Sequence, residues 1–154
     1  MIRNANINDA AAVVEIYNYY VDNTIIAFAE THLTKEEVVS QMQGIFRWYV
    51  WEERSRLLGY AYASKFKSSW AYKTSVETTV YLYHQSIGKG IVSALYQTLI
   101  DNLDGSGYHA LIGGISMHKP GSVAIHEKFG NKKVAHGGIC HFPFFVPHFT
   151  AKIR

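Results

Sequence analysis

The strongest constraint on the fold is a strand that runs into a glycine-containing turn and then into a helix. Residues Thr74 to Tyr83 read TSVETTVYLY, and β-branched and aromatic residues of this kind favour a strand. Gly88-Lys89-Gly90 follows, and apolar residues at helical spacing come next: Ile91, Leu95, Leu99 and Ile100. Such a unit suits an anionic ligand, because glycines let the ligand approach the backbone and the first helical N–H groups lack intrahelical acceptors. An ordinary strand-to-helix turn with two glycines remains the alternative, since short glycine motifs are weak evidence.

The spacing excludes two common phosphate-binding motifs. No Gly-Lys-Ser/Thr sequence follows at the distance that a Walker A loop requires. The third glycine of a dinucleotide-binding fingerprint is missing, and antiparallel hairpin elements precede the strand. The unit therefore belongs to a different class of fold.

Two helices are predicted in the first third of the chain, after a strand over Ile2 to Ala5. Asn8 is placed to cap the first helix, whose apolar face consists of Val13, Ile16, Tyr17, Tyr20 and Val21. Thr34 and Glu37 form a capping-box pattern that starts a second helix through Val38, Val39 and Met42.

Further strands flank the glycine turn. Trp48 to Glu53 and Arg56 to Ala63 are predicted to form a hairpin around a turn at Arg54 and Ser55. Ala110 to Ile115 is predicted as a buried strand, and a short helix from Val123 to Phe129 follows, between a Ser122 cap and a Gly130 stop. Strands and helices in this order predict an α/β (mixed α+β) fold with one sheet, in a single domain over residues 1–154.

Composition narrows the classes of partner. The formal net charge is +3 and the basic residues are scattered, which argues against a nucleic-acid-binding protein. One cysteine, Cys140, permits no intrachain disulfide. The N-terminal residues lack the apolar core of a signal peptide, and no stretch approaches the length of a membrane helix. We therefore expect a cytoplasmic protein with no membrane or nucleic-acid partner.

Two residues near the glycine unit are candidates for proton transfer. Glu77 interrupts an otherwise apolar and aromatic strand; if it is partly buried, its pKa rises towards neutrality, as a general base for an ammonium substrate requires. An exposed strand glutamate is the alternative. His126 lies in the predicted short helix and titrates near neutral pH, although an amphipathic helix also accommodates a histidine without a catalytic role.

With these segments in view, the chain resembles the GNAT superfamily of N-acetyltransferases, and more closely its phosphinothricin and methionine sulfoximine acetyltransferase branch. The resemblance covers residues 2 to 134 and is carried by NTIIAFAE, WAYKTSVETTVYLY, GKGIVSALYQTLI and GSVAIHEKFG. It implies a GNAT fold, with a central, mixed but mostly antiparallel sheet flanked by helices, and acetyl-CoA as the acetyl donor.

The resemblance also implies roles for individual residues. Glu77 would be the base, and His126 would stand where many relatives carry a tyrosine acid. Acetyl-CoA would contact the backbone at Val80, Tyr81 and Leu82, the loop residues Gly88, Lys89, Gly90, Ile91, Val92 and Ser93, and the later Lys119. The residues expected to line the acceptor site are Phe28, Glu30, Lys67, Tyr72 and Tyr81.

The chain departs from the family pattern at several positions. Ile87 stands where the family has Arg or Gln, and Val92 replaces a small residue; a register starting at Gln85 would restore the formula but shift it against the helix. Lys119 replaces an asparagine, and Ser69 replaces an arginine that helps to hold an acidic acceptor. These changes weaken the case for phosphinothricin itself more than the case for acetyl transfer.

The C-terminal segment, residues 136–154, is atypical. Its prolines and phenylalanines make a regular closing hairpin improbable, and its apolar character predicts that a homodimer buries it. His136, Cys140, His141 and His148 suggest zinc, but their spacing matches no standard site, so no metal is expected.

The sequence thus predicts an N-acetyltransferase that acetylates the amine of a small amino-acid-like molecule by direct attack in a ternary complex. An alternative is a catalytically impaired CoA-binding relic, damaged at Ile87, Val92 and the C-terminal segment, that serves as a binding module. Acetylation of protein N-termini or lysines is a third hypothesis, which would require an open groove.

Overall fold

The fold comes from a computed structural model that describes residues 1–24, 31–44, 47–65, 74–103, 106–108, 110–114, 121, 124, 127–129, 131–136 and 143–147. The chain divides into two compact units. The first contains Met1–Ser64 and Thr79–Asn102, and the second contains Lys65–Thr78 and Leu103–Arg154. A single domain over the whole chain stays a prediction.

The first unit contains an antiparallel set of strands. β1 (Ile2–Asn4) pairs with β2 (Arg47–Glu53), which pairs with β3 (Arg56–Lys65). β4 (Ser75–Leu82) follows β3 in the strand order, and Tyr83 N–H donates to the Leu58 carbonyl at 2.8 Å. The predicted strands are confirmed here, with ends that differ by one or two residues.

The β2–β3 hairpin closes through the predicted two-residue turn. Arg54 and Ser55 have φ values of 49° and 60°. A type I′ turn needs positive φ at both central residues, because only this geometry matches the twist of the flanking strands. The turn therefore forms without glycine.

The first helix begins differently from the prediction. Asn6, not Asn8, is the capping residue: its side chain accepts from Asn8 N–H, and Asp9 completes a capping box around the 3₁₀ turn η1 (Ile7–Asp9). α1 (Ala10–Asn23) then continues from Asp9, which makes no side-chain cap of its own. The prediction for Asn8 was wrong because a 3₁₀ turn, which needs its own cap, precedes the α-helix.

The second helix, α2 (Lys35–Gly44), has the predicted capping box. Thr34 N–H donates to Glu37 Oε2 at 2.7 Å, and Glu37 N–H donates to Thr34 Oγ1 at 3.2 Å. Two backbone donors at the helix start are satisfied in this way.

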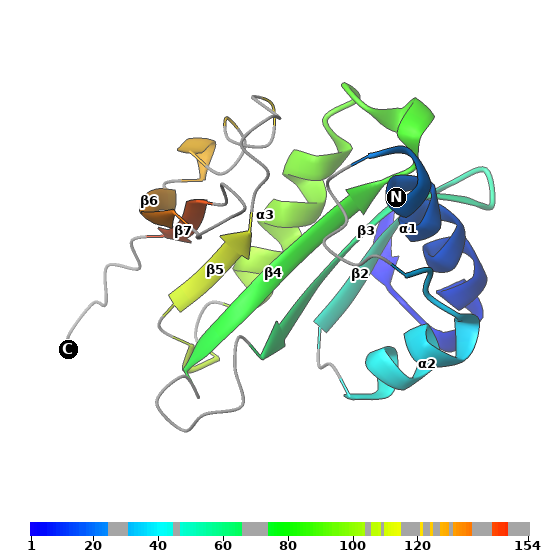
Figure 1. Ribbon diagram of the computed structural model, residues 1–154, viewed down its shortest axis with the longest axis horizontal. Coiled ribbons are helices and arrows are strands. Elements are labelled where there is room, and N and C mark those ends of the chain that lie inside the picture. Colours follow the sequence, from blue (N-terminus) through cyan, green and yellow to red (C-terminus); the bar gives the residue numbers. More distant parts are fainter. Residues whose placement is uncertain are drawn as a thin grey trace. The chain divides into compact units, whose positions relative to one another are not determined.

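Helices cover both faces of the sheet in the first unit (Figure 1), with α1 and α2 on one face and α3 (Ile91–Leu103) on the other. Gly59 on β3 lies beneath α3: a Cβ there would come within 2.6 Å of Leu82 and 3.3 Å of Leu95. On the opposite face, α1 packs on β2 and β3. The buried residues of that core are Ala10, Val13, Ile16, Tyr20, Val38, Trp48, Val50, Leu57 and Tyr60.

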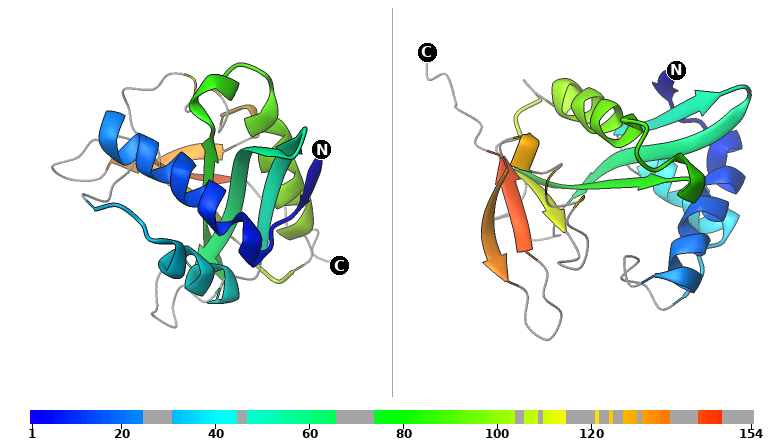
Figure 2. Two further views of the ribbon diagram at one scale, coloured as in Figure 1. Left: turned by 90° about the vertical axis from the view of Figure 1, so that its right-hand side faces the viewer. Right: turned by 90° about the horizontal axis from the view of Figure 1, so that it is seen from above.

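The second unit contains the start of β4 and three further strands. β5 (Ala110–Gly114) runs parallel to β4, and β7 (Pro143–Pro147) is antiparallel to both β5 and β6 (Asn131–His136). Figure 2 shows β6 and β7 side by side. The expectation that no regular hairpin forms here was wrong. Both prolines stand at the ends of β7, where a missing N–H interrupts the ladder least.

Candidate active site

Strand β4 carries the residues that the sequence singled out, and it presents two different faces. Val76, Thr78 and Leu82 are buried, whereas Glu77 and Tyr81 are half-buried. Glu77 belongs to the second unit and Tyr81 to the first.

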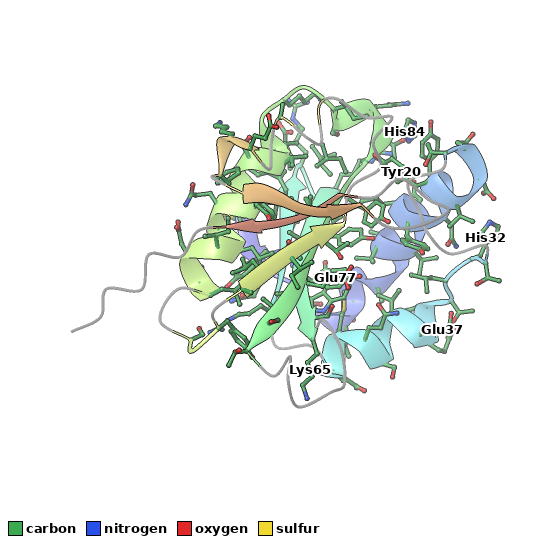
Figure 3. The ribbon with its side chains drawn as sticks, turned by 60° about the vertical axis from the view of Figure 1, so that its left-hand side comes forward. Tyr20, His32, Glu37, Lys65, Glu77 and His84 are labelled. Atoms are coloured by element: carbon green, nitrogen blue, oxygen red, sulfur yellow. The ribbon has the colours of Figure 1, made fainter. Side chains whose placement is uncertain are left out.

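Glu77 is not the fully exposed strand glutamate that was the alternative, and its role as a base stays a prediction. The side chain is half-buried, and burial raises the pKa of its carboxyl above the ordinary value. A carboxylate with a raised pKa is a stronger proton acceptor than one in water. Figure 3 labels Glu77 on the ribbon of β4.

Tyr81 lies within a cluster of tyrosines from three elements. Its ring centroid is 5.3 Å from that of Tyr20 and 5.5 Å from that of Tyr17, both on α1, and 5.6 Å from that of Tyr60 on β3. Edge-on and tilted contacts of this kind are favourable beyond the area that they bury. Tyr81 is therefore held rigidly against α1.

The end of β4 turns part of its backbone away from β3. Tyr83 N–H points to β3, where it donates to Leu58 O, so the N–H and C=O of the preceding Leu82 point to the opposite edge. The parallel register with β5 runs from Ser75↔Ala110 to Thr78↔Gly113, whereas β4 continues to Leu82. The predicted pantetheine contacts, Val80 to Leu82, lie beyond that register.

Tyr20 reaches this edge of the strand. Its hydroxyl donates to the Leu82 carbonyl at 2.9 Å, in a buried hydrogen bond between residues 62 positions apart. The sequence placed Tyr20 on the apolar face of a helix but gave no signal for this contact. A pairing over such a distance depends on the packing of α1 against the sheet.

The turn after β4 holds the glycines in conformations that other residues adopt rarely. Gly88 and Gly90 have φ values of 85° and 76°, in the left-handed region, and a Cβ at either position would meet nothing within 4 Å. The backbone conformation, not crowding, is therefore the reason for glycine. The 3₁₀ turn η3 (His84–Ser86) precedes the two glycines. The His84 ring stacks on the Tyr19 ring, with the two ring centroids 4.0 Å apart. Tyr20 and His84 are labelled in Figure 3.

The start of α3 presents backbone donors. Ala94 N–H donates to Gly90 O at 3.1 Å, which opens the helical ladder. The N–H groups of Ile91, Val92 and Ser93 come before that bond and have no acceptor within the helix. Together with the positive end of the helix dipole, they suit a diphosphate.

The side chains of the loop add little polar recognition. Ile87 is 66% exposed, and Lys89 is exposed as well. Val92 and Ser93 are half-buried. Lys89 is the residue of this loop whose charge complements an anion, while Ile87 offers a ligand no hydrogen bond.

Several predicted site residues lie outside the described part of the chain. They are the second catalytic candidate His126, the cofactor contact Lys119, and the acceptor-site residues Phe28, Glu30, Lys67 and Tyr72. Residues 123, 125 and 126 of the predicted helix, and the tail residues Cys140, His141 and His148, also fall outside it. Their roles stay predictions.

Neither a metal centre nor a membrane span is found among the described residues. No three His, Cys, Asp or Glu side chains there are grouped as metal ligands would be. No helix in the same part of the chain has the length and apolar character to cross a bilayer.

Comparison with known proteins adds the family. Residues 2–139 match the Acetyltransferase (GNAT) domain. The chain belongs to the GNAT acetyltransferase family. It is 36% identical over 133 residues to the phosphinothricin N-acetyltransferase of Streptomyces coelicolor, covering 82% of this chain and 78% of that one. It is also 31% identical over 132 residues to the phosphinothricin N-acetyltransferase of Streptomyces viridochromogenes, covering 84% of this chain and 72% of that one.

Solved structures agree with this assignment. The phosphinothricin acetyltransferase of Sinorhizobium meliloti, in complex with AcCoA, is similar with a TM-score of 0.87 and 29% identity, over 95% of this chain and 86% of that one. The predicted family, its phosphinothricin and methionine sulfoximine acetyltransferase branch, and the mixed α/β fold are thus confirmed. The GNAT protein is an acetyltransferase that uses acetyl-CoA as its acetyl donor.

Proposed function

We propose that this GNAT enzyme acetylates the primary amine of a small amino-acid-like molecule, with Glu77 as the general base. Relatives named for phosphinothricin and for methionine sulfoximine and methionine sulfone indicate the class of acceptor. The observation that carries the proposal is that Glu77 is half-buried on the strand that leads directly into the glycine loop. This burial raises the pKa of the Glu77 carboxyl.

The cofactor is proposed to bind along a continuous segment of chain. Val80 and Leu82, whose backbone groups point away from β3, would hydrogen-bond the pantetheine arm as an added strand does, with Tyr81 between them. The diphosphate would rest on the amides between Gly88 and Ser93, where glycine φ values and unused helical donors provide a cradle. Lys119 would add a further cationic contact. This arrangement relies on backbone donors, which agrees with the apolar side chain of Ile87.

The transfer itself is proposed to be direct. Glu77 accepts a proton from the ammonium group, directly or through water, and the neutral amine attacks the thioester carbonyl. A C–N bond forms, the attacking nitrogen releases its second proton to water, the C–S bond breaks, and the departing thiolate takes a proton, for which His126 is the proposed donor. Leu82 N–H donates to the developing oxyanion. We expect proximity to supply most of the acceleration and proton transfer a further factor of about 10²–10⁴.

The acceptor is proposed to contact Phe28, Glu30, Lys67, Tyr72 and Tyr81. Support comes from Tyr81, whose ring is held in place by contacts with the rings of Tyr17, Tyr20 and Tyr60.

The test is a thiol-release assay with acetyl-CoA over a panel of amino acids, their sulfoximine and phosphinate analogues, and short peptides. We expect thiol release with a small amino-acid-like amine, and a rate about 10²–10⁴-fold lower for Glu77→Gln. Glu53→Gln is the matched control, because Glu53 is also a strand glutamate but is exposed. Saturable CoA binding without thiol release would favour the impaired relic instead, and faster turnover of peptides would favour a protein acceptor.

Three broader properties of the protein are also proposed: its compartment, its oligomeric state and its domain organisation. The single cysteine agrees with a reducing compartment such as the cytoplasm. The apolar C-terminal segment agrees with a homodimer, and the family match over residues 2–139 agrees with one domain. Analytical ultracentrifugation tests the dimer, and a monomer at micromolar concentration would contradict it.

A further inference from the structure

The last peptide unit of β4, which joins Leu82 to Tyr83, is held from both edges of the strand. Its N–H donates to Leu58 O on β3 at 2.8 Å, and its C=O accepts from the Tyr20 hydroxyl on α1 at 2.9 Å. A peptide plane with a hydrogen bond at each end cannot tilt without breaking one of them. The chain turns into η3 directly afterwards, so no further strand residue stabilises this end.

Tyr20 is itself fixed in place. Its side chain is 8% exposed, and its ring contacts those of Tyr19 and Tyr81 at 5.6 Å and 5.3 Å. Burial raises the pKa of the Tyr20 hydroxyl, which therefore stays protonated and can donate at any working pH. The hydroxyl is thus a rigid donor, and its position is determined by the packing of α1 against β3 and β4.

The constraint passes to the neighbouring amide. Leu82 N–H belongs to the preceding peptide, which is joined to the fixed Leu82–Tyr83 peptide through the Cα of Leu82, so fixing the latter restricts the directions that Leu82 N–H can take. The strength of a hydrogen bond falls steeply when the donor is misaligned. In catalysis, donors must be aimed in advance at the position where charge develops.

We propose that Tyr20 is a positioning residue for acetyl transfer: its hydroxyl fixes the last peptide of β4 so that Leu82 N–H is aimed at the thioester oxygen. This inference rests on the proposed function, since it needs acetyl-CoA on this edge of β4. Tyr20 itself touches neither the thioester nor the amine.

Tyr20→Phe tests the proposal, because it keeps the ring contacts and removes only the hydroxyl. We expect kcat to fall about 10- to 100-fold while KM for acetyl-CoA stays unchanged. Tyr17→Phe is the matched control: Tyr17 also packs on Tyr81 from α1, and in the described part of the chain its hydroxyl makes no hydrogen bond to β4. We expect its kcat to equal that of the wild type.

A second measurement distinguishes misalignment of the Leu82 N–H from a loss of folded protein. The infrared carbonyl band of bound [1-¹³C]acetyl-CoA should lie at lower frequency in the wild type and in Tyr17→Phe than in Tyr20→Phe, where it should return towards the value of free acetyl-CoA. Equal kcat and equal band position in wild type and Tyr20→Phe would overturn the inference and leave the proposed function intact. If the wild type binds acetyl-CoA but releases no thiol, the proposed function fails. The difference in carbonyl band position between wild type and Tyr20→Phe then still tests whether Tyr20 positions Leu82 N–H. Absence of acetyl-CoA binding would overturn both.

Discussion

At the scale of single residues, Glu77 gives the enzyme its clearest expected pH dependence. Burial raises the pKa of this carboxyl, and the proposed base must be deprotonated to accept a proton. We therefore expect kcat/KM to rise with pH, with a slope of about one on a logarithmic scale, through an inflection above the ordinary glutamate pKa of about 4.3.

A pH profile with two acceptors of different amine pKa identifies the group responsible. An inflection that belongs to Glu77 stays in place when the acceptor changes, whereas one that belongs to the substrate moves with it. Glu77→Gln should abolish the rise of kcat/KM with pH, and Glu53→Gln should retain it. A rise that survives in Glu77→Gln would show that another group provides the base.

The same residues show what a sequence reveals about a site. Glu77 was singled out as a candidate because a carboxylate inside an apolar strand is unusual, and that signal is local. Tyr20 looked like any tyrosine on an amphipathic helix, and its proposed role depends on a hydrogen bond to a residue 62 positions away. Contacts over that distance require the fold, which the residue pattern does not contain.

At the scale of elements, we expect the backbone conformation of the glycine loop to limit which residues can replace its glycines. Gly90 has a φ of 76° and open space around a hypothetical Cβ. Gly90→Ala should therefore cost about 1 kcal/mol in stability. Relaxation to negative φ would also turn the loop amides away from the cofactor and weaken acetyl-CoA binding.

Gly44→Ala is the control for this element. Gly44 ends α2, a Cβ there also meets nothing within 4 Å, and its φ is not in the left-handed region. The substitution should leave stability unchanged or raise it slightly, since alanine lowers the entropy of the unfolded chain. Calorimetric titration with acetyl-CoA, together with urea unfolding, measures both variants. Equal affinity of Gly90→Ala and wild type would contradict the role of the loop.

Elements with strong local signals were predicted well. The capping box at Thr34 and Glu37 and the turn at Arg54 and Ser55 both formed as expected, since each depends on residues close in sequence. The β6–β7 pair was missed because its prolines were taken to exclude pairing, although proline at a strand end is tolerated. Asn8 was taken as the cap because the sequence gave no sign of the preceding 3₁₀ turn.

At the scale of the whole molecule, resistance to acid should depend on one ion-pair network that joins three elements. Arg3 on β1 donates to both carboxylate oxygens of Asp9 at 2.8 Å, and its Nε donates to Glu52 on β2 at 2.6 Å. Burial alone would raise the pKa of Asp9, but the hydrogen bonds from Arg3 and from Asn6 N–H outweigh it and lower that pKa.

The sign of the pH effect follows from this lowered pKa. The unfolded chain takes up the Asp9 proton at a higher pH than the folded protein does, near the ordinary value of about 3.9. The contribution of Asp9 to stability is therefore fully present above that pH, and it is lost as the pH falls through the lower pKa of the folded state.

Asp9→Asn isolates the charge, because an asparagine oxygen can still accept from Asn6 N–H. At pH 7 we expect the free energy of unfolding to fall by about 1–3 kcal/mol, the cost of leaving a part-buried charged partner unsatisfied. Below pH 4 the difference from the wild type should shrink, since the unfolded wild-type chain then takes up the Asp9 proton and the folded protein loses the stability that the charge provides. Urea unfolding at several pH values measures this, with Glu15→Gln, at an exposed position within α1, as control. A difference that stays constant from pH 7 to pH 3 would mean that Asp9 stabilises the fold through shape and neutral hydrogen bonds, and that its charge contributes nothing.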